Sequence, residues 1–151
     1  MPHKTKILIT GANGYLGNCL YNFFKKKYQV VGIDIKNNFN KKIYKCNILN
    51  VKKFNSFLEK TKPKIIVHLA AQSLVDETIN KDKYFKNNVL ATKILLQSMM
   101  KYKIKNIIFS STASVYKKSN KPLTEKSPLE PLSYYAKTKL NAENLIKGSR
   151  N

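Results

Sequence analysis

The sequence predicts an α/β fold built on a doubly wound parallel sheet, and three observations lead to this prediction. Short apolar runs of strand length alternate along the chain with longer segments of helical period, which is the pattern of repeated βαβ units. A glycine-rich loop joins the first apolar run to the first helical segment. The chain of 151 residues is also long enough for one domain with a substantial core. We therefore expect a single domain over residues 1–151.

The first predicted strand, Lys6 to Thr10, leads through the glycine loop into a predicted helix from about Tyr15 to Lys27. Gly11 allows the tight turn after the strand, and Gly14 lets the backbone approach a phosphate group. Gly17 lets the helix pack closely on the sheet. Because the helix N-terminal amides would face the phosphates, the loop predicts a Rossmann-like site for the pyrophosphate of a dinucleotide. The alternative is a tight turn that binds nothing.

The second predicted strand, Gln29 to Asp34, ends in a carboxylate about 20 residues beyond the glycine loop. A carboxylate at this position can accept hydrogen bonds from both ribose hydroxyls of NAD and repels a 2′-phosphate. Asp34 therefore favours NAD over NADP. Lys36 leaves NADP open, since a nearby cation could accommodate the phosphate, and Asp34 could also be only a turn residue that closes the strand.

Two further strands enclose the next helix. A short strand is expected at Ile43 to Lys45, and a helix follows the N-cap candidate Asn50 and stops before Pro63, which cannot continue it. The next strand is expected at Lys64 to Ala70.

A long helix is then expected at Lys83 to Tyr102, before a strand at Lys105 to Ser110 and a last helix at Ser133 to Lys147 that ends at the C-cap candidate Gly148. A loop rich in Ser, Pro and Lys separates the last strand from that helix. An alternating pattern would call for another strand after it, so we expect the strand Lys105 to Ser110 to lie near an open sheet edge. The apolar face of the long helix is expected to comprise Phe85, Val89, Ile94, Leu95 and Met99.

Tyr135 and Lys139 are four residues apart, so on a helix they lie one turn apart on the same face. An ammonium group in this position can lower the pKa of a phenol toward neutrality and make Tyr135 a general acid or base. Thr112 follows the strand that ends at Ser110 and can hold a substrate oxygen in line. A Tyr and a Lys at this spacing are common in any helix, but here they follow a dinucleotide loop and a strand that ends in hydroxyl residues.

Five segments, spread in order over nearly the whole chain, resemble one protein family. They are Thr10 to Gly17, His68 to Ser73, Asn88 to Thr92, Ser110 to Tyr116, and Tyr135 to Lys139 followed by Glu143. In these segments the chain resembles the N-terminal part of an extended short-chain dehydrogenase/reductase of the NAD-dependent sugar-nucleotide epimerase/dehydratase family, similar to UDP-glucose 4-epimerases. Members of this family are about twice as long, so the resemblance implies a Rossmann-like sheet truncated before its last strands, with the C-terminal substrate domain absent.

The resemblance also implies roles for individual residues. Tyr135 would be the catalytic base, Lys139 would also bind the nicotinamide ribose, and Thr112 would hydrogen-bond the reacting hydroxyl. Asn47 stands where the family usually has an aspartate that contacts the adenine. The implied cofactor-binding residues are Gly11, Asn13, Gly14, Tyr15, Leu16, Gly17, Asp34, Asn47, Ile48, Leu69, Ala70, Ala71, Asn88, Ser110, Tyr135 and Lys139.

The family's 4,6-dehydratases carry an acidic pair directly after the Ser/Thr position, whereas this chain has Ala113 and Ser114 there. The resemblance therefore favours an NAD-dependent epimerase that acts on a nucleotide sugar such as UDP-glucose or UDP-galactose. A dehydratase or reductase of the same family, or a non-catalytic NAD-binding fragment, are the alternatives. Because the last strand is expected near an open sheet edge, a fragment of a longer enzyme, or a homodimer or other partner that completes the sheet, is expected.

Composition excludes several other classes of function. The net charge of +21 comes almost entirely from lysines scattered along every segment, with a single arginine, Arg150. Because nucleic-acid recognition favours arginine, we expect no specific nucleic-acid partner. No apolar run approaches the length of a membrane span, and no signal peptide precedes the first strand, so a cytoplasmic protein is expected. His3 and His68 are too few for a metal site, and Cys19 and Cys46 are expected to fill the core.

Overall fold

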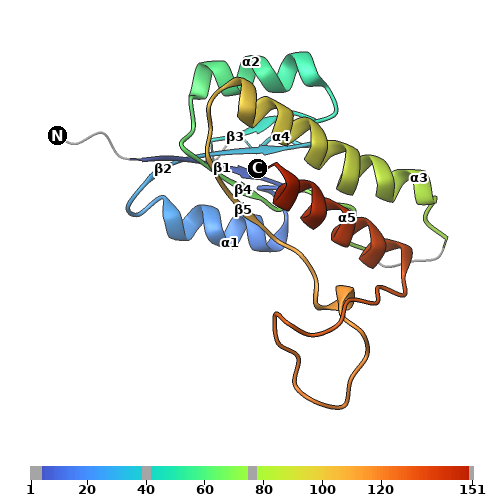
Figure 1. The fold of residues 1–151 in the computed structure, drawn as a ribbon. Coiled ribbons are helices and arrows are strands. Elements are labelled where there is room, and N and C mark those ends of the chain that lie inside the picture. The colour runs from blue at the N-terminus through green and yellow to red at the C-terminus, as the bar shows by residue number, and fades with distance from the viewer. Residues whose placement is uncertain (1–4, 39–41, 75–77, 150–151) are drawn as a thin grey trace. The chain divides into compact units, whose positions relative to one another are not determined.

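The computed structural model describes residues 5–38, 42–74 and 78–149. Five parallel strands form one sheet in the order β3-β2-β1-β4-β5 (Figure 1). The order runs outward in both directions from β1, as in a doubly wound sheet. The predicted fold class is therefore confirmed. The strands are β1 (Lys6–Thr10), β2 (Gln29–Asp34), β3 (Ile43–Lys45), β4 (Ile65–His68) and β5 (Asn106–Phe109).

The chain divides into two compact units, which are described separately. The first unit comprises the residues up to Ala70 together with Ile94–Ser110, and it contains the whole sheet. Three helices contribute to it: α1 (Tyr15–Phe24), α2 (Val51–Thr61) and most of α4 (Ala91–Lys101). Helix α1 covers one face of the sheet, and α2 and α4 cover the other (Figure 1).

The core of the first unit lies on both faces of the sheet. Alternate residues of β1 point to opposite faces, and Ile7 and Ile9 belong to a buried cluster with Tyr21 of α1. Leu8, between them, is fully buried, as are Phe54 of α2 and Leu95 of α4. Because the sheet is buried on both faces, the carboxyl ends of its strands, where the candidate site residues of this unit lie, have defined positions.

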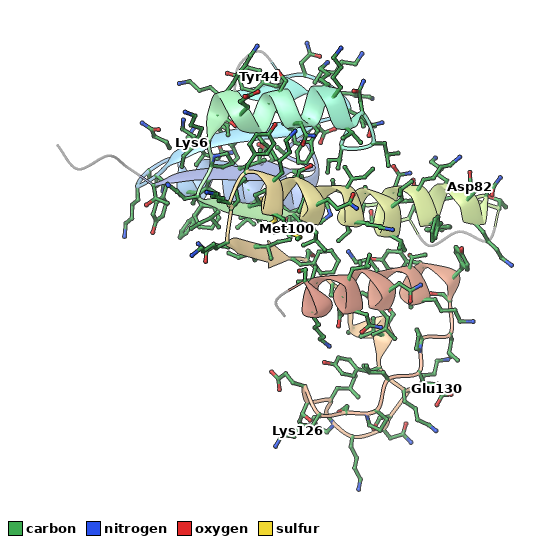
Figure 2. The ribbon with its side chains drawn as sticks, turned by 45° about the horizontal axis from the view of Figure 1, so that its top comes forward. Lys6, Tyr44, Asp82, Met100, Lys126 and Glu130 are labelled. Carbon is green, nitrogen blue, oxygen red and sulfur yellow. The ribbon has the colours of Figure 1, made fainter. Side chains whose placement is uncertain are left out.

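The second unit comprises residues 71–93 and 111–151, without the undescribed positions. Its first part contains a continuous helical segment. The segment consists of α3 (Lys81–Tyr84), the π-helical turn η1 (Phe85–Leu90) and the start of α4. The short helix η2 (Ala113–Val115) and the long helix α5 (Tyr134–Gly148) complete it. Figure 2 shows Asp82 on α3 and the loop residues Lys126 and Glu130. The prediction of one domain over residues 1–151 is not tested by this division and stays a prediction.

The first three strands have the predicted bounds, while β4 and β5 are each shorter than predicted. Helix α1 ends at Phe24 rather than Lys27 because the chain tightens into i→i−3 hydrogen bonds, from Lys26 N to Phe23 O at 3.4 Å and from Lys27 N to Phe24 O at 3.0 Å. Gly148 was predicted to cap α5, but it is the last helical residue, and Ser149 is the C-cap.

Two predicted core positions are wrong. Cys19 is exposed on α1, whereas Cys46 is buried as predicted. Phe85 was assigned to the apolar face of the long helix, yet it is 44% exposed. The π-helical turn that begins at Phe85 places more residues in one turn than an α-helix does, so the inward face shifts to Tyr84 and Asn88, which are both buried.

None of the helices in the described part of the chain combines the length and apolar character needed to cross a membrane. The described residues also contain no group of three or more His, Cys, Asp or Glu side chains that could hold a metal ion.

Candidate functional site

The glycine loop after β1 has the close contacts that its predicted role requires. Gly11 has a φ of +68°, and a Cβ atom built on it would lie 2.8 Å from the Ala70 nitrogen. A Cβ atom on Gly17 would lie 2.2 Å from the Gly11 oxygen, because the first turn of α1 packs directly on the loop. A side chain at either position would therefore displace the main chain.

The N-terminus of α1 is open to an anion. Gly14 is the N-cap residue, and no side chain caps this helix end. The first turn contains no acidic residue, and the neighbouring residues Tyr15 and Leu16 are exposed. A Cβ atom on Gly14 would meet only the Gly11 oxygen, at 3.2 Å. The helix amides are therefore accessible to a phosphate group, and the dipole of the helix favours it.

Asp34, at the end of β2, lies beside this loop. Its Oδ2 atom accepts a hydrogen bond from the backbone N–H of Asn13 at 3.0 Å, and its Oδ1 atom accepts one from the backbone N–H of Lys36 at 3.4 Å. Asn13 in turn donates its side-chain amide to the Lys36 carbonyl at 2.8 Å. Each carboxylate oxygen retains a lone pair for a further donor, such as a ribose hydroxyl. Asn13 and Asp34 thus form one hydrogen-bonded group with the loop.

Thr10 holds the segment after β4 beside the end of β1, and the sequence analysis, which names Thr10 as the start of a family segment, gave it no such role. Its buried hydroxyl group accepts hydrogen bonds from the backbone N–H groups of Leu69 and Ala70 at 3.2 and 3.1 Å, and it is hydrogen-bonded to His68 Nδ1 at 2.7 Å. The segment after β4 is therefore held at the carboxyl end of β1. A polar residue at the end of an otherwise apolar strand was the available signal.

The remaining predicted residues of the first unit lie at strand ends. Asn47 follows β3, is exposed, and accepts a hydrogen bond on its side chain from Leu49 N at 3.0 Å. Ile48 is buried. Ser110 follows β5, and its backbone N–H donates to the His68 carbonyl at 3.3 Å. Their contacts with a cofactor stay predictions.

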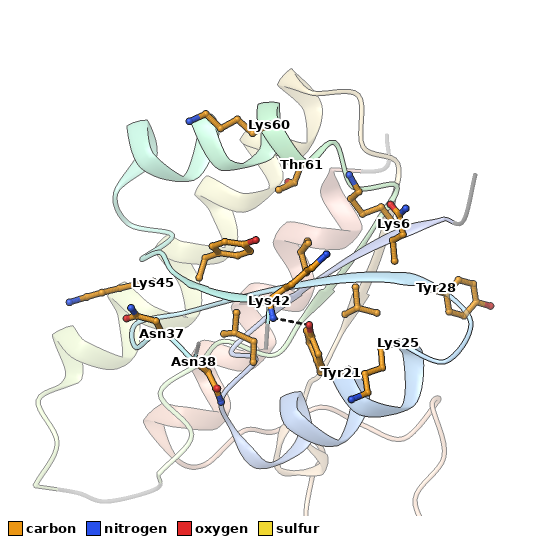
Figure 3. Close-up of a pocket in the computed structure, with 15 residues that line it drawn as sticks. Lys6, Tyr21, Lys25, Tyr28, Asn37, Asn38, Lys42, Lys45, Lys60 and Thr61 are labelled. Carbon is orange, nitrogen blue, oxygen red and sulfur yellow. Dashed lines mark hydrogen bonds between the residues drawn. The ribbon is translucent and has the colours of Figure 1, made fainter. Parts of the chain in front are cut away.

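The first unit also has a surface pocket of about 1000 Å³ beside β3 (Figure 3). Five lysines line it, together with Tyr21, whose hydroxyl accepts a hydrogen bond from Lys42 N at 2.9 Å. Figure 3 shows that Lys45 and Lys60 extend away from Lys42 on different sides of the pocket. Because these ammonium groups do not converge, the pocket is not a built anion site.

The second unit contains the predicted acid–base residues. Ser133 caps α5 by accepting a hydrogen bond from Ala136 N at 3.1 Å, so Tyr135 lies in the first turn and Lys139 in the next. Thr112 and Tyr135 are joined by a side-chain hydrogen bond. The Thr112 oxygen also accepts from Ser114 N at 3.2 Å. The structure thus brings Thr112 and Tyr135 together, with Lys139 one turn further along the helix.

Burial dominates the ionisation of this pair. Desolvation lowers the pKa of Lys139 from 10.5 to about 8, against an opposing effect of the Glu143 carboxylate. Desolvation raises the pKa of Tyr135 above 10.0, and the hydrogen bond from Thr112 opposes the rise. We expected the Lys139 ammonium group to lower the pKa of the Tyr135 phenol toward neutrality. This expectation is wrong, because the pKa of Tyr135 is raised: desolvation outweighs the hydrogen bond from Thr112.

Asn88 is a hydrogen-bonding centre of the second unit. Its Oδ1 atom accepts from Gln72 N at 2.8 Å, and its Nδ2 atom donates to the Gln72 carbonyl at 3.2 Å and to Thr138 Oγ1 at 3.0 Å. It is buried within the π-helical turn. The side-chain amide thus ties the start of this unit, next to Ala71, to helix α5. Direct contact of Asn88 or Ala71 with a cofactor stays a prediction.

Comparison with known proteins assigns the chain to a family. Residues 7–151 match the model of the NAD dependent epimerase/dehydratase family. The chain is 32% identical to dTDP-D-glucose 4,6-dehydratase of Dictyostelium discoideum, over 94% of this chain and 39% of that protein. It is also 32% identical to UDP-glucose 4-epimerase of Lactobacillus helveticus, over 93% of this chain and 46% of that protein.

The fold agrees with these sequence relationships. The chain resembles the crystal structure of UDP-glucose 4-epimerase from Brucella ovis in complex with NAD, with a TM-score of 0.88 and 27% identity over 95% of this chain and 47% of that one. The chain spans about half the length of these relatives. From the family match, the glycine loop and the Tyr135–Lys139 pair, we conclude that the chain belongs to the NAD-dependent epimerase/dehydratase family.

Proposed function

We propose that the chain provides the cofactor-binding and acid–base residues of an NAD-dependent epimerase that acts on a nucleotide sugar, such as UDP-glucose or UDP-galactose. The observation that carries the proposal is the hydrogen bond between Thr112 and Tyr135, with the buried Lys139 one helical turn away. The chain belongs to a family of NAD-dependent enzymes, and relatives of similar identity include a UDP-glucose 4-epimerase.

The residues of the first unit fit NAD. The uncapped N-terminus of α1 would bind the pyrophosphate, and Asp34 would accept hydrogen bonds from the adenosine ribose. The carboxylate of Asp34 would repel a 2′-phosphate, which is the reason to prefer NAD to NADP. When bound, NAD supplies the chemistry of accepting a hydride from the sugar and returning it.

The residues of the second unit would move the proton. Tyr135 would take the proton of a sugar hydroxyl as a general base and return it as an acid, while Thr112 would hold the same oxygen by a hydrogen bond. The Lys139 ammonium group would stabilise the tyrosinate that forms. A surface pocket of about 860 Å³ offers room for a sugar, and it is lined by Ala113 and Ser114 next to Thr112 and by Ser133 at the start of α5, among others.

Epimerisation is preferred to dehydration because the two residues after Thr112 are not acidic. Ala113 has no side chain that could transfer a proton, and Ser114 is a poor acid and base at neutral pH. Dehydration and reduction remain the alternatives within the family, and the 4,6-dehydratase of Dictyostelium is as similar to this chain as the epimerase. A non-catalytic NAD-binding module is the alternative outside enzymes.

The test is to incubate the protein with NAD and UDP-glucose or UDP-galactose and to follow the products by chromatography and mass spectrometry. Interconversion of the two sugars that is lost in Tyr135→Phe and kept in Tyr134→Phe supports the proposal. Tyr134 is the matched control because it is the adjacent residue of α5 and packs on Tyr84. A product lighter by one water identifies a dehydratase, and NAD binding without turnover identifies a module; either result contradicts the proposal.

A cytoplasmic location and a partner for the sheet, either a second copy or another chain, remain proposals. Size-exclusion chromatography with light scattering tests the second of them, since a dimer would elute with twice the mass of 17.4 kDa.

A further inference from the structure

Glu143 is an acidic residue of α5 that the proton transfer described above does not use. It lies one turn beyond Lys139, and its side chain is 20% exposed. One of its carboxylate oxygens, Oε1, accepts a hydrogen bond from the Ser111 hydroxyl. The other oxygen, Oε2, lies 3.7 Å from the Lys147 ammonium group. The carboxylate is therefore held at a defined position on the same helix face as Lys139.

The hydrogen bond to Ser111 fixes a segment that matters for Tyr135. Ser111 directly precedes Thr112, so the two consecutive hydroxyl residues contact two different turns of α5: Thr112 binds Tyr135, and Ser111 binds Glu143. A segment held at two points on one helix has less freedom to rotate than one held at a single point. Glu143 thus helps to place the Thr112 hydroxyl against the phenol.

The charge of Glu143 acts on Lys139. Lys139 is only 4% exposed, and its burial disfavours the ammonium form. The carboxylate one turn away favours that form. A lysine stabilises a tyrosinate only while the lysine is charged. The Glu143 carboxylate favours the charged form of Lys139 and so supports this stabilisation.

Other ionisable groups of the surrounding elements are engaged elsewhere. Asp82 of α3, which Figure 2 labels, forms an ion pair with Lys86 at 2.6 Å, and the Lys81 ammonium group lies over the Tyr134 ring. Tyr84 packs against the Tyr135 ring and donates its hydroxyl to the Leu74 carbonyl at 2.6 Å.

In the loop after η2, Lys117 is paired with Glu130 at 3.1 Å. Tyr116, the residue after η2, is half-buried and forms a β-bridge with Leu129. Glu143 is the acidic residue whose charge raises the pKa of Lys139.

We propose that Glu143 is a positioning residue of the Tyr135–Lys139 pair, which holds the Ser111–Thr112 segment on α5 through its hydrogen bond and keeps the Lys139 ammonium group charged. The proposal rests on the function proposed above, in which this pair moves the proton. Its two parts are separable, because a glutamine at position 143 keeps an oxygen for Ser111 but has no charge. An alanine at position 111 removes the hydrogen bond and keeps the carboxylate.

The experiment is an NMR titration of the protein labelled with ¹³Cε-lysine and ¹³Cζ-tyrosine. The Lys139 and Tyr135 signals are identified by their absence in Lys139→Met and Tyr135→Phe. In Glu143→Gln, the titration midpoint of Lys139 should fall below that of the unmodified protein, because the opposite charge that raises it is removed. In Ser111→Ala, the midpoint of Lys139 should stay and that of Tyr135 should rise, because the Thr112 hydrogen bond that lowers it is loosened. Glu130→Gln removes the same charge from the Lys117 pair and should move neither midpoint.

Two results overturn the proposal. An unchanged Lys139 midpoint in Glu143→Gln removes the electrostatic part, and an unchanged Tyr135 midpoint in Ser111→Ala removes the positioning part. Neither titration needs sugar or NAD, so failure of the proposed epimerase activity cannot be mistaken for failure of this proposal. Circular dichroism of both variants checks that α5 remains folded.

Discussion

Replacing Lys139 by methionine should stabilise the protein at neutral pH, and the effect should disappear as the pH rises. Lys139 is almost fully buried, and its pKa is lowered from 10.5 to about 8. The lowered pKa means that folding disfavours the charged form of this side chain. Methionine has a similar length and no charge to desolvate.

The magnitude follows from the pKa change. The shift from 10.5 to about 8 is about 2.5 units, and at about 1.4 kcal/mol per unit it corresponds to about 3 kcal/mol of lost stability at pH 7. Between pH 8 and 10.5 the unfolded chain binds the proton of Lys139 more than the folded chain does, so stability rises with pH in this window. At pH 10 the unmodified protein therefore regains most of the free energy of unfolding that it lacks at pH 7. The Lys139→Met variant has no such pH-dependent contribution from position 139.

The assay is urea denaturation of the unmodified protein and of Lys139→Met at pH 7, 8, 9 and 10. The free-energy difference between the two proteins should favour the variant by up to about 3 kcal/mol at pH 7 and shrink steadily above pH 8. Lys147→Met is the control, because the Lys147 side chain is 69% exposed on the same helix. A difference for Lys139→Met that stays constant from pH 7 to 10 would refute the assignment of a buried lysine with a lowered pKa.

Three further substitutions test individual contacts. Gly17→Ala should lower the free energy of unfolding by about 3 kcal/mol or more, since its Cβ would lie 2.2 Å from the Gly11 carbonyl oxygen. The control Gly148→Ala should not destabilise the protein, because a Cβ there meets nothing within 4 Å, and thermal melts of the two variants measure the difference. Thr10→Val should lower the free energy of unfolding by about 2 kcal/mol because the buried hydroxyl that accepts from the Ala70 N–H and bonds the His68 ring is removed, and an unchanged melting temperature would contradict the role given to Thr10. Thr112→Val should raise the pKa of Tyr135 further, as measured by ¹³Cζ-tyrosine NMR, and a lowered pKa would show that the hydrogen bond is absent.

Local patterns in the sequence were sufficient to predict most of the sheet. The bounds of β1, β2 and β3 agree with the prediction, and β1 and β2 are short, mainly apolar runs that the sequence alone reveals. The N-cap Asn50 was predicted because a capping side chain acts within three residues of its own position, whereas Ser133, predicted as the first residue of the last helix, is its N-cap. These features depend on few neighbours.

Features that depend on distant contacts were missed. The π-helical turn at Phe85–Leu90 changes which residues face inward, and nothing in the periodicity of the long helix indicated it. The hydrogen bonds of Thr10 join residues about 60 positions apart. The direction of the Tyr135 pKa shift was wrong because helical spacing reveals the neighbouring lysine but not the loss of solvent around the phenol. Residue types and spacing thus led to Thr112 and Tyr135, which the structure brings together, whereas the ionisation of Tyr135 and Lys139 depends on burial.

The most direct test of the account is the affinity of the protein for NAD and NADP, measured by calorimetry on the unmodified protein and on Asp34→Asn. Asp34 lies against the glycine loop through its hydrogen bond with Asn13. The account predicts that NAD binds at least about tenfold more tightly than NADP, because a carboxylate beside a 2′-phosphate is strongly unfavourable, and that Asp34→Asn narrows the difference. Equal affinities for the two dinucleotides in the unmodified protein, or no binding of NAD, would contradict it.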